Sequence, residues 1–352
     1  SALSSAYGAA AGPESAAPTM IGDTISGGLS GVKFYGTGPL SDVHGTNIAL
    51  SGGSRRFKMS ELESPVPLDR VFFEYNHFQN TLLDVGDGTA GSERWHNLDR
   101  FSFGLERTFR DGLWSFELRV PFAGGFNSTQ TIGGSLSGTE FGDMSLAFKR
   151  ALIRTDRFTL SAGLNIIFPT GSDYRIVDST GTLVEVWNEA VHLNPFFGAL
   201  WSPTDRLFVL FFGQMDFDTH GNRVLMAPTG GGPLSIVDTF HEQTQGFLDL
   251  GIGYRLFQNP DARILTGITP IVELHYTSTL TNMDYVTGPQ GAIGAAMVPG
   301  DPGRRDILNM TGGVQLQFGP MSTLTVAGVV PLRNDLNRQF DSEVIAQFER
   351  RF

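Results

Sequence analysis

The chain has 352 residues, a formal net charge of -11 and no cysteine, but 44 glycines and 28 phenylalanines. The negative charge excludes nucleic-acid binding through a basic face, and the lack of cysteine excludes disulfides, thiolate metal sites and cysteine nucleophiles. A helical membrane protein needs runs of about 20 apolar residues, whereas the longest fully apolar run here is Leu207–Phe212.

The first segment, residues 1–68, differs from the rest of the chain. It is rich in Ser, Gly and Ala, contains five prolines and alternates poorly between apolar and polar residues. Short extended pieces are expected around Val32–Tyr35 and Ile48–Met59. Since so many Gly and Pro residues cannot build a core or a regular ladder, we expect an N-terminal extension or a plug of a larger domain. A start at Ser1 without Met fits a mature, processed chain, and a trimmed chain would look the same.

From Arg70 onward the chain alternates regularly, most clearly over Arg100–Phe122. Phe101 and Phe103 share one face of a strand, whereas Ser102 and Glu106 share the other. Asp111-Gly112 then supplies a tight turn, because Gly accepts the positive φ that such turns require. Side chains alternate with period two along a strand, so each strand has one apolar side and one polar side.

The connections alternate as well. Short ones are expected at 110–112, 150–157, 202–205, 258–261 and 319–322, and long ones at 81–96, 123–139, 169–189, 218–243, 277–303 and 331–340. Twelve strands lie between them: 70–80, 97–110, 112–123, 140–150, 157–168, 190–201, 206–217, 244–257, 262–277, 305–318, 322–332 and 342–352. Short turns on one side and long loops on the other are typical of transmembrane barrels, and an even strand number places both barrel ends on one side.

These patterns predict an all-β fold, a transmembrane antiparallel up-and-down β-barrel of about 12 strands over residues 69–352. Residues 1–68 form the N-terminal extension or lumen plug. A strand near Ile48–Met59 would raise the count to fourteen, and a soluble sandwich is the alternative to the whole interpretation. The last strand, Glu343–Phe352, ends on an aromatic residue and resembles the recognition signal of outer-membrane barrels, although Arg350 departs from the apolar face expected there.

The stretch Phe141–Ser172 resembles the outer-membrane porin family named for the meta pathway of phenol degradation. The matching features are Gly142-Asp143 at the start of a strand, a hairpin turn, and Gly163 followed by Pro169-Thr170-Gly171. A second stretch, Arg56–Phe78, is similar to a segment of uncharacterised outer-membrane proteins. The first resemblance implies a barrel that takes up small molecules, apolar ones among them, and it supplies no catalytic residues.

A charged side chain on the lipid side costs about 2–4 kcal/mol at the bilayer midplane, so the polar faces should point into the lumen. The predicted lumen-lining residues are Glu74, Arg100, Glu106, Glu117, Arg119, Asp143, Lys149, Asp249, Arg255, Glu273, His275, Gln315 and Glu349. Such residues could set the ion preference of a pore. The alternative is a network of salt bridges that braces a narrow barrel.

Aromatic residues near the predicted strand ends fit the girdles that lie at headgroup level, with core packing of a soluble sandwich as the alternative. They are Trp114, Phe122, Phe168, Trp201, Tyr254, Tyr276 and Phe352.

Other candidate chemistry is weak. The seven histidines show no local metal-binding spacing, and His275 beside Glu273 is the best acid–base candidate. Asp84–Gly88 mimics part of a calcium loop but lacks the later acidic ligand. We therefore expect no catalytic residues, no metal and no cofactor.

The sequence favours a porin-like channel of the bacterial outer membrane for passive transport of small solutes. Barrels of about eight strands are filled by side chains, and barrels of about sixteen to eighteen strands hold an open aqueous channel, so a barrel of twelve strands should have a narrow pore. A structural barrel, closed by residues 1–68 and binding envelope partners, is the second hypothesis, and an outer-membrane hydrolase is the third. The expected partners are outer-membrane lipid, small solutes and the barrel-assembly machinery through the C-terminal strand, with a homo-oligomer or envelope complex left open.

Overall fold

The computed structural model describes residues 17–23, 31–35, 44–47, 57–84, 86–87, 89, 91–228, 232–282, 284–288, 295–298, 304–334 and 337–352. These residues form β-strands joined by turns and loops. No helix among them is long and apolar enough to cross a membrane.

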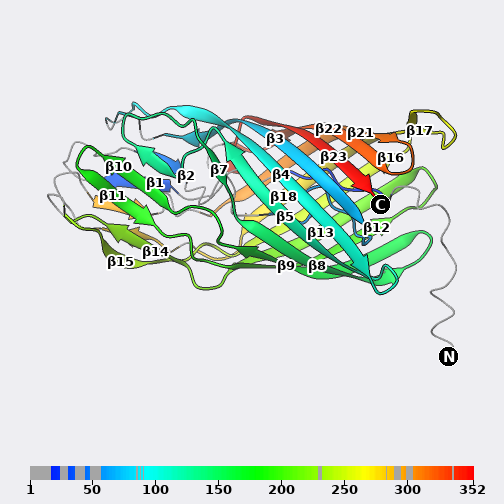
Figure 1. The fold of residues 1–352 in the computed structure, drawn as a ribbon, viewed down its shortest axis with the longest axis horizontal. Helices are drawn as coiled ribbons and strands as arrows, with labels where there is room; N and C mark the ends of the chain where they lie inside the picture. Colours follow the sequence, from blue (N-terminus) through cyan, green and yellow to red (C-terminus); the bar gives the residue numbers. More distant parts are fainter. Residues whose placement is uncertain are drawn as a thin grey trace.

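Twelve antiparallel strands form a closed barrel, in which each strand pairs with its neighbours in chain order and the last strand pairs with the first (Figure 1). They are β3 (Arg70–Leu83), β4 (Trp95–Phe109), β5 (Trp114–Gly124), β8 (Met144–Arg154), β9 (Phe158–Phe168), β12 (His192–Trp201), β13 (Leu207–Asp218), β16 (Gln245–Tyr254), β18 (Leu265–Thr279), β21 (Asp306–Phe318), β22 (Ser322–Pro331) and β23 (Ser342–Arg351). The predicted fold class and the count of twelve are confirmed, and the fourteen-stranded alternative is wrong.

The tight turn between β4 and β5 has the backbone geometry that its sequence predicts. Arg110, Asp111 and Gly112 have φ values of 52°, 60° and 70°, so the chain passes through three left-handed residues in succession. Such residues match the twist of the flanking strands. The turn sets the register in which Phe103 lies opposite Val120.

The outer face of the barrel is apolar. Large side chains project from it, with exposed fractions of 51% for Phe103, 50% for Leu248 and 58% for Val272. Their neighbours in sequence, such as Ser102 and Glu273, are buried on the inner face. An exposed apolar surface that continues around a barrel is stable in lipid rather than in water.

Pairs of Phe and Gly on adjacent strands account for part of the unusual composition. Phe72 lies opposite Gly104, and a Cβ on that glycine would lie 1.9 Å from the Phe72 ring. Phe208 and Gly253 repeat the arrangement, with a corresponding distance of 2.1 Å. Glycine therefore makes room for a ring on the opposite strand, which lets large aromatic side chains fill a narrow barrel.

The long connections and part of the N-terminal segment form two further sheets at the end of the barrel opposite the C-terminus (Figure 1). The five-stranded sheet has the order β15 (Ser235–Phe240), β14 (Asn222–Met226), β11 (Gly181–Val186), β10 (Tyr174–Asp178) and β6 (Thr129–Thr131). The four-stranded sheet has the order β19 (Val286–Thr287), β20 (Ala295–Val298), β1 (Gly31–Tyr35) and β2 (His44–Asn47). Two short strands extend the barrel wall, β7 (Thr139–Phe141) on β5 and β17 (Phe257–Gln258) on β18. The segments expected as plain loops are thus partly folded.

The N-terminal segment contributes both to the four-stranded sheet and to the barrel interior. Strands β1 and β2 pair with each other, and β1 also pairs with β20 of a long connection. The expected extended piece at Val32–Tyr35 coincides with β1. Of the second expected piece, residues 48–56 lie outside the described residues, and residues 57–59 form no strand. Residues 17–23 and 57–69 contact the inner face of the barrel wall instead.

Candidate functional site in the barrel interior

The inner face of the wall is strongly polar. Of the predicted lumen-lining residues all but Arg255 are buried, namely Glu74, Arg100, Glu106, Glu117, Arg119, Asp143, Lys149, Asp249, Glu273, His275, Gln315 and Glu349. Arg255 follows β16 and lines a pocket with Pro18 and Gln315. Asp143 lies between β7 and β8, where it accepts a hydrogen bond of 2.8 Å from Asn188 Nδ2. These residues do not form one ring but separate clusters at different depths.

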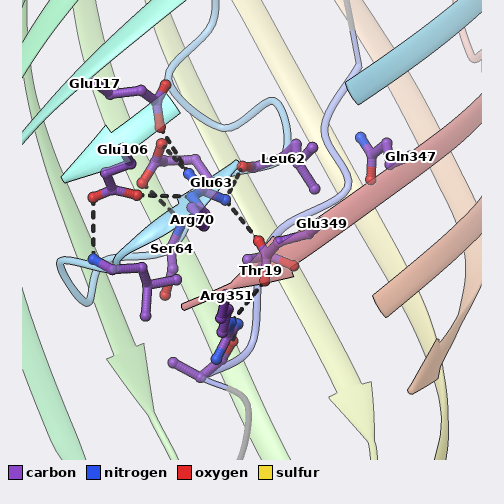
Figure 2. Close-up of polar contacts among 12 residues, drawn as sticks. Thr19, Leu62, Glu63, Ser64, Arg70, Glu106, Glu117, Gln347, Glu349 and Arg351 are labelled. Carbon is purple, nitrogen blue, oxygen red and sulfur yellow. Dashed lines mark hydrogen bonds and ion pairs between the residues drawn. The ribbon is translucent and has the colours of Figure 1, made fainter. Parts of the chain in front are cut away.

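The first cluster is centred on Arg70, at the start of β3 (Figure 2). Its Nε donates to Glu106 at 2.8 Å, its Nη2 to Glu63 at 2.9 Å and to Glu117 at 2.8 Å. Its Nη1 donates to Glu349 at 2.8 Å and to the carbonyl oxygen of Leu62 at 2.7 Å. All five N–H groups of the guanidinium are therefore satisfied, as a fully buried arginine requires.

Three further cations complete this cluster. Arg119 Nε lies 2.5 Å from Glu117, and Arg351 Nε lies 2.8 Å from Glu349. Lys149 pairs with Glu63 and, at 2.9 Å, with Glu106. Four cationic side chains thus face four carboxylates, so the cluster is electrically balanced; its members are Arg70, Arg119, Lys149, Arg351, Glu63, Glu106, Glu117 and Glu349.

The second cluster joins residues 17–23 and 57–69 to strands β16 and β18. Lys58 Nζ lies 2.5 Å from Asp23 and 3.4 Å from Asp249. His275 Nδ1 lies 2.8 Å from Asp249 Oδ1. Its Nε2 is 3.2 Å from a carboxylate oxygen of Glu273 but is not aligned as a hydrogen bond. His275, the acid–base candidate, is thus enclosed by buried carboxylates.

Backbone groups of the segment are bound by inner side chains of the wall. Glu273 accepts hydrogen bonds from the amides of Ile21, at 2.7 Å, and Gly22, at 2.8 Å. Gln214 accepts one from the amide of Met59 at 2.7 Å and donates to the carbonyl oxygen of Phe57 at 2.8 Å. Such bonds satisfy backbone groups that have no ladder partner.

Residues 17–23 and 57–69 therefore make two separate passes along the inner wall. Between them the chain forms β1 and β2, which pair with each other, and β1 also pairs with β20 at the opposite end from the C-terminus (Figure 1). Met20, Ile21 and Leu62 are at most 1% exposed. Along these passes the space inside the wall is occupied by the chain itself.

The sequence interpretation missed the residues that the segment contributes. Lys58, Glu61 and Glu63 form ion pairs with the wall, and Arg70 was taken only as the first strand residue. The sequence does carry a signal for Arg70. Residues two apart in a strand share a face, so Arg70 lies on the same inner face of β3 as Glu74. No comparable periodicity exists within residues 57–69.

Two groups of buried ligand atoms have spacings that suit a metal, but both contain cations of the chain. Atoms of Asp23, Asp249 and His275 lie within 4.8 Å of one another, as do those of Glu63, Glu106 and Glu117. Lys58 occupies the first group, and Arg70 and Lys149 occupy the second. Neither group therefore has carboxylates left for an ion.

The predicted interface aromatics are exposed or half-buried, and none is fully buried: Trp114, Phe122, Phe168, Trp201, Tyr254, Tyr276 and Phe352. Trp201 and Phe352 are each 54% exposed. Phe352 also lies under the guanidinium of Arg107, which is 5.2 Å from the ring centroid.

In the outer sheets, Arg223 of β14 pairs with Glu189, which precedes β12. Arg223 Nε donates to Glu189 Oε2 at 2.7 Å. The hydrogen bond from Arg223 lowers the pKa of the Glu189 carboxyl below its ordinary value. This pair links the five-stranded sheet to the chain that enters the barrel wall.

Comparisons with known proteins show similarity in fold. No family model matches the chain, and no curated protein matches it. An outer-membrane channel from Pseudomonas putida F1 is 13% identical, with a TM-score of 0.51 over 82% of this chain and 97% of that one. The NanC porin is 11% identical, with a TM-score of 0.43 over 80% of this chain and 98% of that one. The toluene transporter TodX of Pseudomonas putida is 10% identical, with a TM-score of 0.39 over 94% of this chain and 98% of that one. The match with the channel from Pseudomonas putida F1 shows that the chain has the fold of an outer-membrane β-barrel channel.

Proposed function

We propose that this protein is a channel of the bacterial outer membrane for the passive transport of small solutes, and not an enzyme. The observation that carries the proposal is the closed twelve-stranded barrel with an apolar outer face and a charged inner face. The outer face suits lipid, and the inner face suits water and polar solutes. The fold shared with the Pseudomonas putida channel supports the same function.

We further propose that residues 1–68 act as a plug that holds the channel narrow. The support comes from the two passes along the inner wall and from their ion pairs with β4, β5, β8 and β16. The lumen of a twelve-stranded barrel is narrow even without a plug. Solute flow therefore requires part of the segment to move.

The solutes are small. The resemblance of Phe141–Ser172 to the porin family named for the meta pathway of phenol degradation favours small molecules, apolar ones included. A transport assay with liposomes that hold the purified protein, using a panel of neutral and charged solutes of increasing size, would rank them.

Conductance in a planar bilayer tests the channel and the plug together. Deletion of residues 1–60 removes Asp23 and Lys58 but keeps Glu61 and Glu63, so the ion pairs with Arg100 and Arg70 remain. The shortened chain should still form a heat-modifiable barrel, and its conductance should exceed that of the full chain. An unchanged conductance, with the segment freely cleaved by protease in the intact protein, would refute the plug.

A structural barrel that binds envelope partners is the second candidate. The observation that favours it is the dense set of buried ion pairs between the segment and the wall, since buried pairs are disrupted only at a large cost. Absence of conductance from both the full and the shortened chain, with both barrels folded, would favour this candidate over the channel.

The C-terminal strand is the proposed contact with the barrel-assembly machinery. Phe352 directly follows β23 with its ring more than half exposed, and its amide donates to the carbonyl oxygen of Asp69 at 3.2 Å. An exposed aromatic residue beside the last strand is available for contact with a second protein.

A further inference from the structure

Two buried carboxylates on the seam between the first and last barrel strands differ from the others in the interior. Glu74 of β3 and Glu343 of β23 are at most 1% exposed. Among the described residues, neither forms an ion pair with a Lys, Arg or His side chain, whereas the carboxylates of the two clusters described above do. Arg100, which lies opposite Asn76 in the neighbouring strand, donates to Glu61 instead.

Each of these carboxylates holds one amide side chain. Asn76 Nδ2 donates to Glu343 Oε1 at 2.8 Å, and Gln347 Nε2 donates to Glu74 Oε1 at 2.9 Å. An amide that donates through its nitrogen keeps its oxygen as a separate acceptor. Gln347 lies directly opposite Glu74, and Asn76 lies opposite Ile345, so the four side chains share one seam of the inner face.

Four oxygen atoms of this seam are buried and accept no hydrogen bond from any described residue. They are Glu74 Oε2, Asn76 Oδ1, Glu343 Oε2 and Gln347 Oε1. Buried polar atoms of this kind are costly unless a donor, a water molecule or an ion satisfies them. Two of these oxygen atoms belong to amides, so amides as well as carboxylates have acceptors without a hydrogen bond here.

We propose that this seam binds one divalent cation of the calcium class through oxygen atoms of Glu74, Asn76, Glu343 and Gln347. Calcium takes six to eight oxygen ligands from carboxylates, amide carbonyls and water, and tolerates irregular geometry. Two carboxylates that form no ion pair among the described residues match its charge. The ion bridges β3 and β23, the strands whose pairing joins the two ends of the wall. This inference does not depend on transport.

Calcium binding to the full chain in detergent, after removal of metals with a chelator, tests the proposal. Equilibrium dialysis with radioactive calcium should show one bound ion, and the midpoint of thermal unfolding should rise with calcium concentration, as mass action requires. The double variant Glu74→Gln with Glu343→Gln should lose affinity by roughly tenfold or more. The matched control, Asp156→Asn with Asp205→Asn, makes the same charge change at exposed positions and should bind as the unaltered chain does.

Failure of the unaltered chain to bind calcium at millimolar concentration would overturn the proposal, and so would equal binding by the double variant. If that variant fails to form a heat-modifiable barrel, Glu343→Gln alone replaces it, since this change keeps an oxygen that can accept from Asn76. Undiminished calcium affinity in a folded Glu343→Gln protein would then overturn the proposal. Binding of magnesium in preference to calcium would also overturn it, because the smaller ion requires near-octahedral geometry.

Discussion

The ion pairs of Glu63 make a direct test of whether the N-terminal segment controls the pore. Glu63 belongs to the segment and contacts three cations of the wall: Arg70 at 2.9 Å, Arg119 at 3.3 Å, and Lys149. Its side chain is 1% exposed. Glu63→Gln keeps the shape and one acceptor oxygen but removes the charge, and it alters no hydrogen bond of the barrel ladder.

The free-energy cost of Glu63→Gln depends on how many carboxylates remain paired with the three cations. Removing one partner of a buried ion pair costs about 3–5 kcal/mol. Arg70 keeps three other carboxylates, Arg119 keeps Glu117, and Lys149 keeps Glu106. The cost should therefore lie near the lower end, about 3 kcal/mol. At about 1.4 kcal/mol for each tenfold change, the population with a displaced segment should rise by a factor on the order of 100.

Single-channel recording in a planar bilayer measures this population as the frequency and duration of openings. Glu63→Gln should open far more often than the unaltered chain at the same voltage. The control is Glu189→Gln, which removes the same charge from a partly exposed pair with Arg223 in the outer sheets and should leave gating unchanged. If a folded Glu63→Gln protein gates like the unaltered chain, the segment is not the gate and the reasoning from its ion pairs is wrong.

Three other changes test the barrel itself. Phe103→Arg places a charge on the lipid side and should impair membrane insertion by about 2–4 kcal/mol, measured as the fraction of heat-modifiable protein, whereas Phe103→Leu should insert normally. Deletion of Phe352 should slow assembly, seen as a delay in the appearance of folded barrel at the cell surface; normal surface levels would count against its recognition role. Gly104→Ala should lower the unfolding midpoint, because its Cβ would lie 1.9 Å from the Phe72 ring, which stacks on Arg70. A midpoint equal to that of the unaltered chain would show that the ring moves aside at no cost.

Local patterns were sufficient to predict the wall. In a strand, successive side chains face opposite sides, so the alternation of Ser102 and Phe103 is enough to assign the inner and the outer face. Turn residues such as Asp111-Gly112 then separate one strand from the next. For this reason the twelve strands, their boundaries within a few residues and the fold class could be predicted from the sequence.

The contents of the interior depended on contacts between residues far apart in the chain. The inward direction of Glu349 follows from alternation, but its pairing with Arg70 on β3 follows only from closure of the barrel, in which β23 pairs with β3. The two passes of the N-terminal segment have no periodicity, because irregular backbone is satisfied by side chains such as Gln214 and Glu273 and not by its own ladder. The sequence by itself determined which face of each strand is polar. Only the tertiary structure decided which charges meet, because ion pairing depends on distances that closure of the wall creates.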